Sequence, residues 1–161
     1  MYTQIISYIT ENQDKFYRLA YSYTKNRDAS LDIVQNAICK ALENYGTIRS
    51  VKFLKTWFYR VLVNECLTYI KKYKNEIYVD DESILEQVYI EDKYNEGLEL
   101  YELIDKLKEE IKIIIILHYY EDMTLKEVSK VTNTNINTVK TRLYSGLRKL
   151  KEYMKEGKLD D

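Results

Sequence analysis

The stretch TNTNINTVKTRLYSGLRKL, residues 132–150, predicts a sharp turn followed by a long helix, and it decides the fold of the C-terminal part of the chain. Just before it, Thr124 and Glu127 have the spacing of a capping box, which starts a short helix. Asn133 tolerates the left-handed backbone that a tight turn needs, and Asn135 is a favourable N-cap for the next helix. The segment therefore predicts a helix-turn-helix.

Apolar residues of the second helix recur at the spacing of one helical face. We expect that face to lie in the core; it comprises Ile136, Val139, Leu143, Leu147, Leu150 and Met154. The second helix of a helix-turn-helix enters the DNA major groove and touches base edges with its N-terminal part. The polar side chains on the other faces are therefore candidate DNA contacts: Asn135, Asn137, Thr138, Lys140, Thr141, Arg142, Ser145 and Arg148.

The residue types on this helix match the chemistry of a DNA groove. Arg142 can form a bidentate hydrogen bond with guanine, and Asn135 or Asn137 can bond with adenine. Lys140 and Arg148 suit backbone phosphates. The alternative is an ordinary amphipathic helix with a polar outer face. Turn, cap, core spacing and charge agree with one another, so the sequence favours DNA binding.

Composition favours an all-α protein without catalytic chemistry. The 161 residues include no proline and four glycines, too few turn residues for many short strands. The two cysteines, Cys39 and Cys66, are far apart in sequence and predict buried thiols in a reducing compartment. His118 follows an isoleucine run and is expected to be structural. No nucleophile–base pair, phosphate-binding loop or metal-ligand cluster is apparent, so we expect no enzyme activity, no cofactor and no metal site.

Charge divides the chain into two basic segments with an acidic one between them. Residues 49–74 carry a net charge of +6, residues 76–105 carry −10 and residues 124–155 carry +6, although the whole chain sums to −1. Basic patches beside aromatic or small polar residues indicate nucleic-acid binding. The charge pattern predicts an N-terminal domain at 1–74, an acidic linker at 75–98 and a C-terminal domain at 99–161.

The N-terminal domain is expected to consist of helices. In FYRLAYSYT, the residues Phe16, Leu19, Ala20 and Tyr23 have helical spacing, and Asn26 with Asp28 suits a break and a new start. The next helix is expected to stop at Gly46, and TWFYRVLVNECLTYIKKYK resumes the helical pattern. The helix before Gly46 has an expected apolar stripe of Leu31, Val34, Ile38, Ala41, Leu42 and Tyr45, with Asp32, Gln35, Asn36 and Lys40 on its opposite face.

From about Phe16 to Lys155, the chain resembles a bacterial extracytoplasmic-function sigma factor of the sigma-70 superfamily. FYRLAYSYTKNRDASLDIVQNAICKAL is similar to the family's opening helices, and WFYRVLVNECLTYIKK to its helix for the promoter −10 element. LHYYEDMTLKEVSKVTNTNINTVKTRLYSGLRKL is similar to its reader of the −35 element. The resemblance implies sigma region 2 at 1–74 and sigma region 4 at 99–161, both helical. Within the family, ENQDKFYRLAYSYTKN and TWFYRVLV resemble the sigma-V type.

The resemblance implies a role for each matching residue. Asp32 and Gln35, in a D-x-x-Q pattern, would contact the clamp helices of core RNA polymerase together with Asn36 and Lys40. The loop before Trp57 would receive a flipped −10 base, which suits a basic-aromatic site. The family's usual arginine and aspartate are replaced by Val63 and Thr68. The −10 contacts would be Arg49, Lys52, Phe53, Lys55, Trp57, Arg60, Asn64, Lys71 and Lys72.

The resemblance also implies partners. These are core RNA polymerase, promoter DNA that is duplex at −35 and melted at −10, and an anti-sigma factor, membrane-anchored in the sigma-V type and linked to cell-envelope stress. The N-terminus lacks the features of a signal peptide and the longest apolar run is short, so we expect a bacterial cytoplasmic protein without direct membrane insertion. The alternative is an autonomous helix-turn-helix regulator whose N-terminal domain senses or dimerises.

Overall fold

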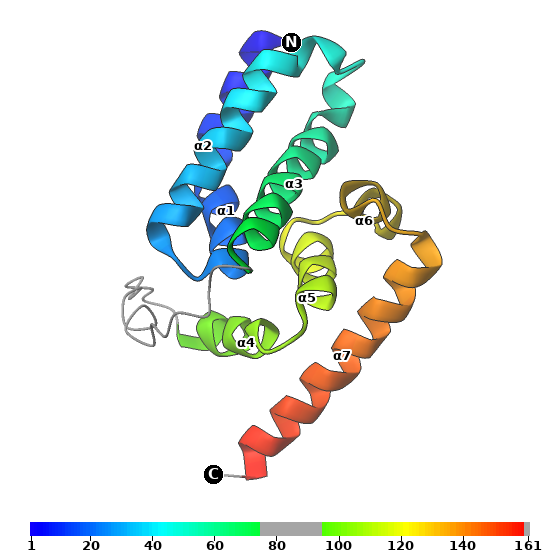
Figure 1. Cartoon of the computed structure of the whole chain (residues 1–161). Helices are drawn as coiled ribbons and strands as arrows, with labels where there is room; N and C mark the ends of the chain where they lie inside the picture. Colours follow the sequence, from blue (N-terminus) through cyan, green and yellow to red (C-terminus); the bar gives the residue numbers. More distant parts are fainter. Residues whose placement is uncertain (75–94, 160–161) are drawn as a thin grey trace. The chain divides into compact units, whose positions relative to one another are not determined.

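The computed structural model describes residues 1–74 and 95–159, which form helices and, within those ranges, no strand. They make two compact units, one within 1–74 and one within 95–159 (Figure 1). The predicted all-α fold is confirmed. Most of the predicted linker, residues 75–94, lies outside the described residues. Helix α4 begins at Asn95, so the second unit starts somewhat before the predicted boundary at residue 99.

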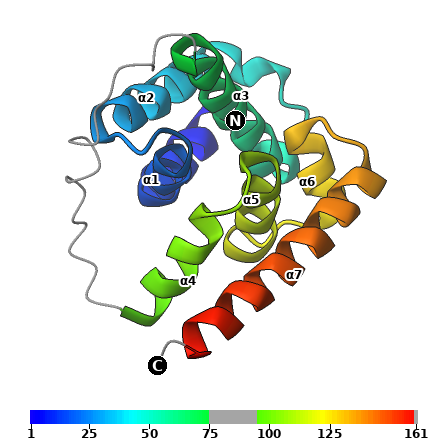
Figure 2. The same cartoon turned by 60° about the horizontal axis from the view of Figure 1, so that its bottom comes forward.

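Helices α1, α2 and α3 of the first unit pack side by side, as both views show (Figures 1 and 2). Each of these helices contacts the other two, so the apolar faces meet in one core. The elements are α1 (Tyr2–Thr24), α2 (Arg27–Asn44), the 3-10 turns η1 (Tyr45–Thr47) and η2 (Val51–Phe53), and α3 (Leu54–Lys74). Among the residues that the structure describes, no helix has the length and hydrophobicity of a membrane span.

The turn between α1 and α2 is built by two residues. Lys25 adopts a left-handed conformation with φ 53°, and its N–H donates to Tyr21 O at 2.9 Å. The Asn26 side chain then caps α2 by accepting a hydrogen bond from Ala29 N at 2.9 Å. An N-cap of this kind satisfies a backbone donor that the first turn of a helix leaves unpaired. The predicted break at Asn26 is therefore confirmed.

The core of the first unit is centred on aromatic rings that pack at tilted and edge-to-face angles. The Phe16 ring lies 4.4 Å from Phe58 and 5.5 Å from Tyr59, centroid to centroid. The predicted α1 face of Phe16, Leu19, Ala20 and Tyr23 is buried, as expected. Aromatic pairs at these separations add to the free energy that burial alone contributes.

The predicted buried stripe of α2 was partly wrong. Leu31 is 41% exposed, whereas Ile33 and Ala37 are buried. Because α2 packs between α1 and α3, its buried face is wider than a single stripe and is shifted away from Leu31. The helix also ends at Asn44, before the predicted stop at Gly46, which lies in the 3-10 turn η1.

The second unit contains a short isoleucine-rich helix packed against a long C-terminal one. Nearly every residue of the isoleucine run is buried, because α5 contacts both α4 and α7. The elements are α4 (Asn95–Asp105), α5 (Glu109–Ile115), the π-helical turn η4 (Ile116–Tyr120), α6 (Leu125–Thr132) and α7 (Ile136–Leu159).

A π-helical turn ends α5, and it places His118 in a structural hydrogen bond. Glu121 N donates to Ile116 O at 3.1 Å, the wide hydrogen bond of a π-turn. His118 Nδ1 donates to Met123 O at 2.7 Å, which ties this turn to the segment before α6. His118 therefore has the structural role that the sequence predicted.

Helix α7 packs closely on α5 through Gly146. A Cβ atom at this glycine would lie 2.5 Å from Ile111 Cγ2 and 2.7 Å from Ile115 Cδ1. The predicted core residues Val139, Leu143 and Leu150 are buried. Met154 is 47% exposed, so its prediction as a core residue was wrong. The helix continues past the end of the core there.

Candidate nucleic-acid interface

The turn between α6 and α7 has the predicted helix-turn-helix geometry. Thr124 Oγ1 accepts from Glu127 N at 3.1 Å, and Glu127 Oε1 accepts from Thr124 N at 3.4 Å, which completes the capping box. Asn133 is left-handed with φ 50° and ψ 46°. Asn135 Oδ1 accepts from Asn137 N at 2.8 Å and caps α7. All three sequence predictions for this turn are confirmed.

The outward face of α7 gathers most of the predicted DNA-contacting residues. A helix turns 100° per residue, so positions separated by four, seven and eleven residues share a face. Asn137, Thr141 and Arg148 lie on the outward face at this spacing and are exposed, and Lys140 is exposed at its edge. The predicted residues on the flanks are half-buried: Thr138, Arg142 and Ser145.

Arg142 lies on the flank of α7 that faces α5. Its Nη2 atom is 3.5 Å from Glu110 Oε2, and 33% of its side chain is exposed. Glu110 is in the first turn of α5 and is itself largely exposed, so solvent screens this ion pair and its contribution to stability is small. The structure thus offers the guanidinium a carboxylate partner within the unit. Its role as a base reader stays a prediction.

Tyr144 is an exposed aromatic residue that sequence reasoning missed. It lies three residues after Thr141 and four before Arg148, on the same outward face, and it is 60% exposed. Tyr144 lies outside the core spacing of α7, so its ring is available for a contact on the outward face. The helical register of Tyr144 was the signal that could have identified it.

A second exposed stripe runs along α3. Arg60, Asn64 and Lys71 are exposed and fall at the same four- and eleven-residue spacing, with Lys72 beside them. Thr68 donates to Asn64 O at 2.8 Å, so its hydroxyl is bonded to its own helix. Lys55 and Trp57, at the start of α3, are half-buried. Val63, where the family usually has arginine, is buried in the core and belongs to a different face.

The loop before α3 presents a basic and apolar surface. Phe53 is 47% exposed and Val51 is 48% exposed. Lys52 Nζ lies 5.8 Å from the centre of the Phe53 ring, and Arg49 is also exposed. Rings beside cations are the elements with which proteins bind unpaired bases. The sequence analysis did not include Val51 among the candidate −10 contacts.

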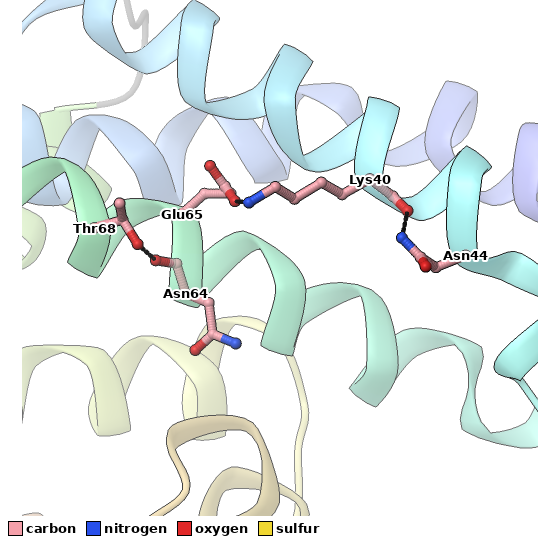
Figure 3. Close-up of polar contacts among 5 residues, drawn as sticks. All are labelled: Lys40, Asn44, Asn64, Glu65 and Thr68. Atoms are coloured by element: carbon pink, nitrogen blue, oxygen red, sulfur yellow. Dashed lines mark hydrogen bonds and ion pairs between the residues drawn. The ribbon is translucent and has the colours of Figure 1, made fainter.

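The outward face of α2 carries acidic and amide groups. Asp32, Gln35 and Asn36 are exposed on it. Lys40, predicted to share this face, turns toward α3 and forms an ion pair with Glu65 (Figure 3). The Glu65 side chain is 10% exposed, and that of Lys40 is 58% exposed. The structure brings three of the four predicted residues together and gives Lys40 a contact between helices.

We expect Lys40→Met to lower the stability of the first unit. The substitution removes the ammonium group but keeps the length of the chain, so the Glu65 carboxylate loses its cation near the core. The loss should be roughly 1–2 kcal/mol, between the values for exposed and buried pairs. Thermal unfolding followed by circular dichroism measures it. The exposed Lys15→Met on α1 should leave the melting temperature unchanged, and Glu65→Met combined with Lys40→Met should restore it.

The pKa values of Cys66 and Tyr69 in the first unit are raised. Burial raises the pKa of the Cys66 thiol, and the Glu65 carboxylate raises it further, so the thiol is unreactive. Cys39 is exposed, so the prediction that both cysteines are buried was wrong for this one. Burial also raises the pKa of Tyr69, with the neighbouring Tyr73 and Asp32 adding to the effect.

Comparison with known proteins gives consistent matches along the chain. The family model of Sigma-70 region 2 matches residues 8–76, and that of Sigma-70, region 4 matches residues 97–150. The RNA polymerase sigma factor SigV of Bacillus subtilis is 41% identical over 144 residues, which cover 89% of this chain and 87% of that protein. The ECF RNA polymerase sigma factor SigW of the same organism is 28% identical over 159 residues, covering 89% and 85%.

Two solved structures share the fold. The sigma factor RpoE of Bartonella quintana, determined in complex with the anti-sigma factor NepR, matches with a TM-score of 0.75 at 19% identity, covering 92% of this chain and 95% of that one. CnrH, in complex with the cytosolic domain of CnrY, matches with a TM-score of 0.65 at 15% identity, covering 94% and 88%.

Proposed function

This chain belongs to the extracytoplasmic-function sigma factors of the sigma-70 family, and we propose that its α2 face binds core RNA polymerase while α3 and α7 contact promoter DNA. A sigma factor directs core RNA polymerase to particular promoters and starts transcription there. The polymerase carries out the chemistry, so no catalytic residue is assigned to this chain.

The outward face of α2 is the observation that carries the polymerase assignment. Asp32, Gln35 and Asn36 present a carboxylate and two amides. DNA phosphates repel a carboxylate, so this surface suits a protein partner. Carboxylates and amides that accept hydrogen bonds from arginine or lysine give a protein interface its register. An autonomous regulator would bind DNA through cationic surfaces such as the outward face of α7 and the loop around Phe53. DNA binding alone gives no role to the acidic and amide face of α2.

The two cationic faces support a division of the DNA contacts. The outward face of α7, with Asn137, Thr141 and Arg148, suits the major groove of a −35 duplex. The loop around Phe53 suits an unpaired −10 base, because its ring and cations are exposed together. The remaining predicted contacts, including Asn135 and Arg142 for −35 and Arg60 and Lys72 for −10, take part in the same proposal.

Regulation by an anti-sigma factor is part of the proposal. The relatives RpoE and CnrH were solved bound to NepR and to the cytosolic domain of CnrY. We infer that this chain is held in the cytoplasm by an anti-sigma factor of its own. The resemblance to the sigma-V type supports a membrane-anchored inhibitor released during cell-envelope stress.

Run-off transcription tests the proposed function. The full chain is mixed with purified bacterial core RNA polymerase and a pool of genomic fragments, and the transcripts are sequenced. We expect a small set of start sites that share −35 and −10 elements and that disappear when the chain is omitted. Transcripts that do not depend on the chain would contradict the assignment.

An autonomous regulator would behave differently with the same DNA fragments. It would bind the selected duplex fragments tightly without polymerase, and a gel-shift experiment would detect this. A sigma factor of this kind should bind the duplex weakly alone and tightly with core polymerase. Tight binding without polymerase, with no transcription, would favour the alternative.

A further inference from the structure

An apolar side chain stands in the middle of the polar stripe on α3. Leu67 is 43% exposed and falls between Asn64 and Lys71, at the seven-residue position counted from Arg60. Single exposed leucines are common on protein surfaces. What distinguishes Leu67 is its position, with an amide and two cations on the same face of the helix.

The length of this stripe matches a DNA groove. Eleven residues separate Arg60 from Lys71, and at about 1.5 Å per residue they span roughly 16 Å. The major groove of DNA is about 12 Å wide, so cations at the two ends of the stripe can reach phosphates on both of its edges. Asn64 and Leu67 then face the bases between those edges.

The side chains in the middle of the stripe suit an A·T base pair. Asparagine bonds with adenine N6 and N7, and an apolar side chain contacts the C5 methyl group of thymine. The side chain of Asn64 points away from the Lys40–Glu65 ion pair and is exposed (Figure 3). Thr68 beside it donates its hydroxyl to Asn64 O, which leaves Leu67 as the neighbouring side chain with an apolar surface to offer.

We propose that Leu67 is a specificity-determining residue that contacts a thymine C5 methyl group in the base-paired DNA that borders the melted −10 bases, next to the base contacted by Asn64. This inference rests on the proposed function of α3 as a promoter-binding helix. It differs from the flipped-base site around Phe53, because a methyl contact requires the edge of a base and not its face.

Replacing thymine with uracil tests the methyl contact directly, because uracil lacks the C5 methyl and keeps the hydrogen-bonding groups. A promoter recovered from the run-off pool is synthesised with each thymine of the −10 element and of the base-paired DNA that borders it, on either strand, changed to uracil one at a time. At one position, we expect transcription by the wild-type chain to fall about fourfold, the equivalent of one buried methyl group. On the thymine template, transcription by Leu67→Ala should already be about fourfold below that of the wild type. Changing that thymine to uracil should not lower it further.

The controls separate the possible failures. Ile6→Ala, an exposed apolar residue on α1, should respond to uracil like the wild type. Insensitivity of the wild type to uracil at every position would overturn the inference, and so would an equal loss in Leu67→Ala. If Leu67→Ala lowers polymerase binding on all templates, Leu67 contacts a protein instead. Failure of the proposed function itself is distinct, because the wild-type chain would then direct no transcription.

Discussion

Replacing Asp32 and Gln35 with alanine together will weaken binding to core RNA polymerase by about 30-fold or more while the chain stays folded. Both side chains are exposed on α2 and contribute nothing to the buried core. Removing one partner of a desolvated, hydrogen-bonded charge pair in an interface costs roughly 2–5 kcal/mol, or about 30- to 4,000-fold in affinity. A pull-down with purified core polymerase, followed by titration, measures the loss.

A matched control is available on the neighbouring helix. Gln13 and Asp14 on α1 are the same residue types and are also exposed. The Gln13→Ala/Asp14→Ala chain should bind polymerase like the wild type, and both double variants should unfold at the wild-type temperature. Wild-type affinity of the Asp32/Gln35 variant would remove the α2 face from the polymerase interface. It would leave the family assignment intact, since that rests on the whole chain.

Gly146→Ala will destabilise the second unit and weaken −35 binding with it. The added methyl group would lie 2.5 Å from Ile111 Cγ2, closer than packed side chains approach one another, so the isoleucine side chains of α5 or α7 itself must shift. Overpacking of this kind costs roughly 1–3 kcal/mol. Since α7 carries the outward face of Asn137, Thr141 and Arg148, loss of its packing against α5 should also lower transcription from −35-dependent promoters.

Gly157→Ala, in the same helix, should have the opposite effect on stability. Apart from its own helix backbone and chain neighbours, no described atom lies within 4 Å of a Cβ at Gly157, and alanine favours a helix over glycine by up to ~1 kcal/mol. This variant should therefore melt slightly higher than the wild type. In a double-mutant cycle, Gly146→Ala should cost less when Ile111 is already alanine. Equal behaviour of Gly146→Ala and Gly157→Ala would show that the close contact is absent.

Local sequence determined the helix-turn-helix. Capping and turn conformation depend on a few neighbouring residues, so Thr124, Asn133 and Asn135 could be assigned from their types and spacing alone. The all-α composition and the position of Asn26 as a helix start were predictable for the same reason. The acidic and amide residues on the outward side of α2 were also identified, because strongly polar side chains rarely lie in a core.

Predictions that depended on neighbouring helices were less successful. Leu31 and Met154 were assigned to the core by periodicity, yet both are exposed. Cys39 was expected to be buried and is not. Periodicity gives the direction of an apolar face, but the width and end of that face depend on which helices cover it.

Only the tertiary structure shows where the side chains of Lys40 and Arg142 point and how closely α7 packs against α5. Lys40 turns toward Glu65, and Arg142 toward Glu110, because partners distant in sequence are brought within reach by helix packing. The sequence gives no sign that Gly146 is needed for packing. The structure shows that the absence of a side chain at Gly146 allows α5 to pack closely against α7. Caps and turns are local and can be inferred from residue type, whereas contacts between helices depend on distances that only the folded chain defines.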